Sequence, residues 1–115
     1  MDKGVETMNW PDTKDGKLFK RLEQGGVNFA KPHYIEFNVD FNQWPPPIDA
    51  ISELKSKFGN IKVFEPSHDS NSPEGYIALK TFTTVTYEYV IDTQREITEY
   101  VQQYGGYCNS WALLM

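Results

Sequence analysis

The side chains that could carry out chemistry are few in this sequence and lie far apart along it. His33 and Glu36 are three residues apart in a predicted strand, so they face opposite sides of a sheet and cannot easily act as one acid–base pair. His68 stands beside Asp69 in a turn-rich stretch, and two ligands are too few for a metal site. We therefore interpret these residues as surface or core polar groups.

The sequence also lacks the motifs with which enzymes bind phosphates, metals or redox partners. It contains no G-x-G-x-x-G, no G-x-x-x-x-G-K, no H-E-x-x-H and no C-x-x-C segment. The single cysteine, Cys108, excludes an internal disulfide, and we expect it to be a small core residue. These observations predict a protein that is not an enzyme and has no catalytic residues, metal or cofactor.

The composition indicates one small domain with an excess of acidic residues. The chain has 115 residues, with 16 Asp and Glu against 11 Lys and Arg and a formal charge of −5. No run approaches the roughly 20 apolar residues that a membrane span needs, and no apolar signal segment follows Met1. We expect a reduced, cytoplasmic protein. The acidic excess repels phosphate backbones, so it argues against direct binding of nucleic acid and favours a basic protein partner.

Apolar residues at helical spacing predict three helices. The first covers about residues 13–24 and the second about residues 47–58, each followed by a glycine that can end it. The third begins at Thr93, which opens a capping box of the S/T-x-x-E form. It ends at Gly105 and Gly106, which we expect to allow positive φ.

Alternating apolar and polar residues predict a strand at about residues 34–41, and a β-branched and aromatic run predicts another at about 76–86. Shorter apolar segments suggest two more strands, at about residues 61–64 and 107–113. The order β-α-β-β-α-β after a leading helix is that of the ferredoxin-like split βαβ, an α+β fold in which two helices cover one face of a four-stranded antiparallel sheet. Residues 1–12 are expected to be a flexible N-terminal arm and residues 13–115 a single domain. The turn-forming stretch 66–75 predicts a mobile loop.

Aromatic side chains are expected to gather on the face of the sheet that the helices leave open. On the last strand, placing the small residues Cys108, Ser110 and Ala112 against the helices sends Tyr107 and Trp111 to this open face. The candidate partner-binding residues are then Tyr34, Glu36, Asp40, Tyr76, Phe82, Tyr107 and Trp111.

Several interpretations of this aromatic set compete. An RNA-recognition motif stacks bases on such a face, but Glu36 and Asp40 lie there and Lys80 is the one basic residue. Tyr and Trp fit a protein-partner site or a self-pairing homodimer better. Some of the rings could instead be core, covered by the leading helix or the arm. A small ligand-binding pocket between sheet and helices would use His33, His68 and Tyr34.

A series of landmarks resembles the RraB family, the regulator of ribonuclease E activity B and its relatives. The landmarks are Asp15-Gly16-x-Leu18-Phe19-x-x-Leu22-x-x-Gly25, Lys31-Pro32 before Ile35-x-Phe37, and Tyr104-Gly105-Gly106-Tyr107 with Trp111. The resemblance covers about residues 13–112. It implies a ferredoxin-like, non-enzymatic domain and, for the founding member, an inhibitor that binds the arginine-rich scaffold region of the endoribonuclease. The founding type ends in an acidic tail, whereas this chain ends in Ala112-Leu113-Leu114-Met115.

Overall fold

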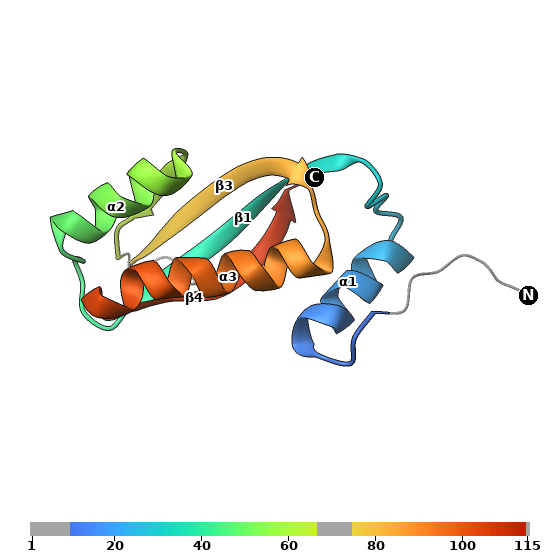
Figure 1. Ribbon diagram of the computed structural model, residues 1–115, viewed down its shortest axis with the longest axis horizontal. Coiled ribbons are helices and arrows are strands. Elements are labelled where there is room, and N and C mark those ends of the chain that lie inside the picture. Colours follow the sequence, from blue (N-terminus) through green and yellow to red (C-terminus); the bar gives the residue numbers. More distant parts are fainter. Residues whose placement is uncertain (1–9, 67–74, 115) are drawn as a thin grey trace, which may run out of the picture.

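The computed structural model of the protein describes residues 10–66 and 75–114. The elements are, in chain order, α1 (Lys14–Gln24), β1 (Pro32–Phe41), α2 (Ile48–Phe58), β2 (Ile61–Phe64), β3 (Tyr76–Thr84), α3 (Tyr87–Val101), the short 3-10 helix η1 (Gln102–Tyr104) and β4 (Gly106–Leu114) (Figure 1). The expected α+β class is confirmed. Residues 1–9 of the expected arm and residues 67–74 of the expected loop, His68 among them, lie outside the described residues.

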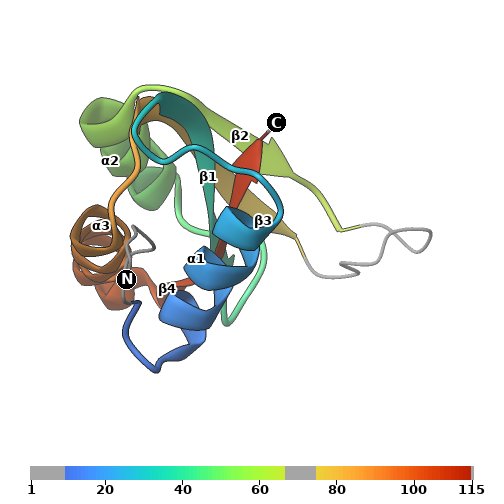
Figure 2. The same ribbon diagram turned by 90° about the vertical axis from the view of Figure 1, so that its right-hand side faces the viewer.

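The four strands form one antiparallel sheet in the order β2-β3-β1-β4. Side chains of β1 alternate between buried and partly exposed positions, and Ile35, Phe37 and Val39 are completely buried. Ile77 and Leu79 of β3 face the same way and are also completely buried. Figure 2 shows α2 and α3 together on one side of the sheet, where they cover this apolar face.

Helix α1 packs beside α3 and β4. Thr13 caps it, because its hydroxyl accepts the Gly16 N–H at 3.0 Å. The buried Phe19 ring lies 5.1 Å from the Trp111 ring of β4, measured between centroids. Trp10, inside the range expected to be a flexible arm, stacks on Phe19 with a centroid distance of 4.6 Å. The packed structure therefore includes at least this residue of the expected arm.

The predicted start of the third helix is wrong. Helix α3 begins at Tyr87, and its cap is Thr86, whose hydroxyl accepts the Tyr89 N–H at 3.0 Å. Thr93 lies in the middle of α3 and is only 7% exposed. The capping-box pattern at Thr93 therefore does not mark the start of a helix. The residues from Tyr87 to Asp92 are also helical, which lengthens the packed part of α3.

Gly105 and Gly106, which follow α3 and η1, are each required for a different structural reason. Gly105 has a φ of 79°, the left-handed conformation that glycine adopts without strain. Gly106 is the first residue of β4, and the expectation of a positive φ there is wrong. Its position has no room for a side chain, because a Cβ would lie 2.6 Å from the Phe41 ring and 3.1 Å from the Cβ of Val101.

The expected position of Trp111 on the open face is also wrong. Val39 pairs with Cys108 while the preceding Asn38 pairs with Ser110, so a bulge at this point leaves one extra residue on β4. The bulge reverses the alternation of side chains along β4. Tyr107 therefore lies on the open face, while Trp111 pairs with Phe37 on the covered face and is only 5% exposed.

We predict that Thr86→Ala lowers the free energy of unfolding by about 1 kcal/mol, because the Tyr89 N–H loses its capping acceptor. Urea denaturation measures the change. Thr86→Ser keeps the hydroxyl and should stay within about 0.5 kcal/mol of the parent. Equal losses for both variants would show that the cap contributes nothing.

Candidate functional site

The open face of the sheet presents its side chains in rows that cross the strands. At one end, Tyr34 of β1 lies between Phe82 of β3 and Leu114 of β4. Phe82 is 57% exposed and Tyr34 is 50% exposed, and their ring centroids are 4.7 Å apart. This set, which we call the Tyr34 cluster, is an aromatic and aliphatic surface that water reaches.

A second aromatic row lies at the opposite end of the same face. It runs from Phe64 of β2 through Tyr76 and Asp40 to Tyr107 of β4. The rings of Phe64 and Tyr76 stack with centroids 4.7 Å apart, and Tyr107 is 44% exposed. Phe64 was not among the residues that the sequence pattern placed on this face. The alternation of Lys62 and Phe64 in the short β2 is the signal that could have placed it there.

The middle of the open face is polar and carries both signs of charge. Glu36 pairs across the strands with Lys80 on one side and Ala112 on the other. The Lys80 ammonium also lies 5.8 Å from the centroid of the Tyr34 ring, a distance at which cation–π attraction acts. Six of the seven candidate partner-binding residues thus share one face; the exception is Trp111.

Trp111 of β4 is instead hydrogen-bonded to a residue of the first helix, α1. Its indole N–H donates to Oδ1 of Asp15 at 2.8 Å, and the other oxygen of Asp15 accepts from Gln94 at 3.3 Å. Gly16, the next residue, has no room for a Cβ, which would lie 1.8 Å from the carbonyl oxygen of Pro11. Asp15, Gly16 and Trp111 therefore form a structural contact that fixes α1 against β4 and α3. Pro32 is the first residue of β1 and is exposed.

The remaining candidates for chemistry do not converge. A ring nitrogen of His33 lies 2.9 Å from the carbonyl oxygen of Asn28, at the start of β1. Glu36 is on the open face, so it does not meet His33. Burial raises the pKa of the Cys108 thiol to about 12, which makes it a poor nucleophile. Within residues 10–66 and 75–114, no three His, Cys, Asp or Glu side chains are grouped so that they could hold a metal ion.

Two other titratable groups hold elements together. The hydroxyl of Tyr104 donates to a carboxylate oxygen of Glu53, which raises the pKa of Tyr104 to about 12 and ties η1 to α2. The Lys57 ammonium lies 5.2 Å from the Tyr100 ring centroid, and hydrogen bonding to Tyr100 raises the pKa of Lys57. These contacts join α2 to α3 and its extension, so both have structural roles.

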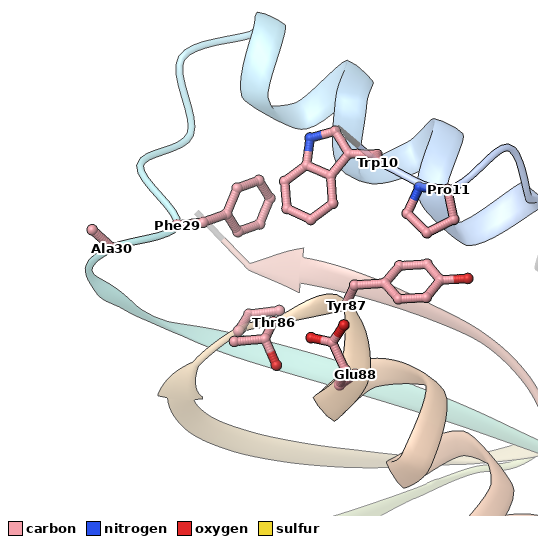
Figure 3. Close-up of a pocket in the computed structure, with 8 residues that line it drawn as sticks. Trp10, Pro11, Phe29, Ala30, Thr86, Tyr87 and Glu88 are labelled. Atoms are coloured by element: carbon pink, nitrogen blue, oxygen red, sulfur yellow. The ribbon is translucent and has the colours of Figure 1, made fainter. Parts of the chain in front are cut away.

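A cleft of about 430 Å³ opens between the segments that flank α1 and the start of α3. Figure 3 shows Trp10, Pro11 and Phe29 on one side of it and Thr86, Tyr87 and Glu88 on the other. His33 and Tyr34, which the sequence suggested for a ligand pocket, do not line it. The cleft instead depends on Trp10 and Phe29, which the sequence pattern did not single out.

Comparison with known protein families identifies the chain. The family described as "Regulator of ribonuclease activity B", RraB, matches residues 12–112. The chain belongs to the RraB family. The resemblance inferred from the sequence landmarks is therefore confirmed, and the description of the RraB family supports a regulatory role.

The RraB match extends from just before α1 to the residue after Trp111, so it includes both partners of the Asp15–Trp111 hydrogen bond. A comparison with curated proteins found no match. In the part of the chain that the structure describes, the helices are all too short or too polar to cross a membrane.

We predict that Asp15→Ala lowers the free energy of unfolding by about 2 kcal/mol, because the buried indole N–H of Trp111 loses its acceptor. Urea denaturation measures it. Asp12→Ala is the matched control, since Asp12 is exposed and its ion pair with Lys17, at 3.6 Å, is on the surface. The control should change stability by less than about 0.5 kcal/mol. Similar losses for the two variants would contradict the structural role of Asp15.

We predict that iodoacetamide labels Cys108 at least about 100-fold more slowly in the folded protein than in the urea-unfolded chain at pH 8. The reason is the pKa of about 12, which leaves little thiolate at that pH. Mass spectrometry of timed samples gives both rates. Labelling at equal rates in the two states would refute the burial of this thiol.

Proposed function

We propose that this RraB-family chain is a non-enzymatic regulator that binds a protein partner through the open face of its sheet. The observation that carries the proposal is the exposed Tyr34 cluster, in which the Tyr34 and Phe82 side chains are each at least half exposed. Aromatic rings of this kind are enriched in the buried centres of protein interfaces, where each removes a large apolar area from water. The family description, regulator of ribonuclease activity, supplies the regulatory role.

The charges of the open face suit a protein better than a nucleic acid. Glu36 and Asp40 both lie on it, and the whole chain has a formal charge of −5. A phosphate backbone needs several cations to neutralise it, whereas Lys80 and Lys62, which both lie on this face, are already placed against the Tyr34 and Phe64 rings. A partner with basic residues between apolar ones would match the polar middle and the aromatic ends.

The target that the family resemblance implies is an endoribonuclease of the ribonuclease E type. We propose that the chain modulates such an enzyme by occupying its basic scaffold region rather than by chemistry. A cytoplasmic location belongs to the same proposal.

The order of elements after α1 and the strand order β2-β3-β1-β4 support a ferredoxin-like arrangement, with α2 and α3 on one face.

Phe82→Ser tests the proposed face. It should weaken binding of the purified ribonuclease by about tenfold or more, because an exposed aromatic anchor of the Tyr34 cluster is lost. Isothermal titration calorimetry measures the affinity, and a gel assay of RNA cleavage measures the regulation.

Ile48→Ser is the matched control. Ile48 is 78% exposed at the start of α2, so this variant removes an apolar side chain away from the open face. It should leave the affinity unchanged. Equal affinity for the parent, Phe82→Ser and Ile48→Ser would reject the open face as the docking surface. If the chain forms a dimer that Phe82→Ser alone dissociates, and no ribonuclease binds, the homodimer interpretation replaces the proposal.

A further inference from the structure

The cleft between the segments that flank α1 and the start of α3 has aromatic walls that the fold holds in place. The Trp10 indole N–H donates to a carboxylate oxygen of Glu23 at 3.1 Å, and its ring stacks on the buried Phe19. The Phe29 ring packs edge-on to Trp10 with centroids 5.6 Å apart. The Trp10 and Phe29 rings on this side of the cleft are thus held in place before any ligand binds. This lowers the entropy cost of binding.

The opposite wall is fixed as well. Its main member is Tyr87, whose hydroxyl lies 3.0 Å from the hydroxyl of Thr13, with which it forms a hydrogen bond. This contact connects the first turn of α3 to the residue that caps α1. The Tyr87 ring lies across the cleft from Trp10 (Figure 3). Three aromatic residues from three different segments therefore border one space of about 430 Å³.

Of the lining residues that the structure describes, one has a charged side chain, and it is acidic. Glu88 lines the cleft and is exposed, and its carboxylate points toward the gap in Figure 3. Within residues 10–66 and 75–114 the Glu88 carboxylate makes no hydrogen bond or ion pair. None of the described residues that line the cleft is basic. An aromatic enclosure with an unpaired carboxylate attracts a cation through both the ring faces and the charge.

We propose that this cleft is a second docking site, which takes an arginine or lysine side chain from a basic segment of a protein partner. The aliphatic stem of such a side chain packs on Phe29 and Tyr87, and its charged end reaches Glu88. A neutral apolar ligand would bury the Glu88 carboxylate without a partner, and an acidic ligand would be repelled by it. The cleft shares no residue with the open face, so its binding can be measured separately from the function proposed above.

The experiment is a titration of the isotope-labelled full chain with a short synthetic peptide, acetyl-Gly-Arg-Leu-Arg-Gly-amide, followed by NMR. The signal is the indole N–H of Trp10, with those of Trp44 and Trp111 as internal references because neither lines the cleft. The control peptide has citrulline in place of each arginine, which keeps the shape and removes the charge. We expect a saturable shift at Trp10 and affinity for the arginine peptide that is about fivefold or more above the control.

Two variants of α3 assign the effect to one carboxylate. Glu88→Gln should weaken binding of the arginine peptide by about fivefold and remove the preference over citrulline. Glu99→Gln makes the same change at an exposed position three turns further along α3 and should bind as the parent does. Both substitutions are at exposed positions, and circular dichroism verifies that each variant is folded.

Other occupants of the cleft give different results, each of which overturns the proposal. Equal binding of the arginine and citrulline peptides would make the cleft a site for neutral apolar groups. A Trp10 shift that depends on protein concentration without peptide would make it a contact with a second copy of the chain. The absence of any saturable shift at Trp10 would show that basic peptides do not bind there, whatever the open face binds.

Discussion

Burial of one face of β1 is the constraint on which the rest of the structure depends. Ile35, Phe37 and Val39 are completely removed from water, and each such side chain contributes roughly 1.5–3 kcal/mol to folding. Because side chains alternate along a strand, burying these residues fixes Tyr34 and Glu36 on the other side. Helices α2 and α3 lie on one side of the sheet only. The exposed aromatic surface is therefore a direct consequence of how the core forms.

The parts of the fold that depend on local periodicity could be predicted from the sequence. The alternation in β1 and the helical spacing before Gly25 placed both elements to within about three residues of their observed bounds. The start of α3 could not be placed in this way, since Thr86 and Thr93 are equally good caps by residue type. Packing of Thr93 inside the helix layer decides between them, and that is a tertiary effect.

The candidate site could also be predicted from the sequence where it depends on the alternation of side chains along a strand. Tyr34, Phe82 and Tyr107 lie on the open face as the alternation predicts. Trp111 does not, because one extra residue in β4 reverses the alternation, and a bulge leaves no clear mark in a single sequence. The hydrogen bond from Trp111 to Asp15 joins residues 96 positions apart, which no local pattern reveals. The cleft depends on Trp10 and Tyr87, which are likewise brought together only by the fold.

We propose that the open face of the sheet, rather than the outer surface of the helices, contacts the partner. Hydroxyl-radical footprinting of the chain with and without the purified ribonuclease tests it most directly, since the method reports the solvent exposure of individual aromatic side chains. The claim predicts strong protection of Tyr34, Phe82 and Tyr107 in the complex, with Ile48 on α2 unchanged. Protection of Ile48 while the three aromatic residues stay as reactive as in the free chain would contradict it.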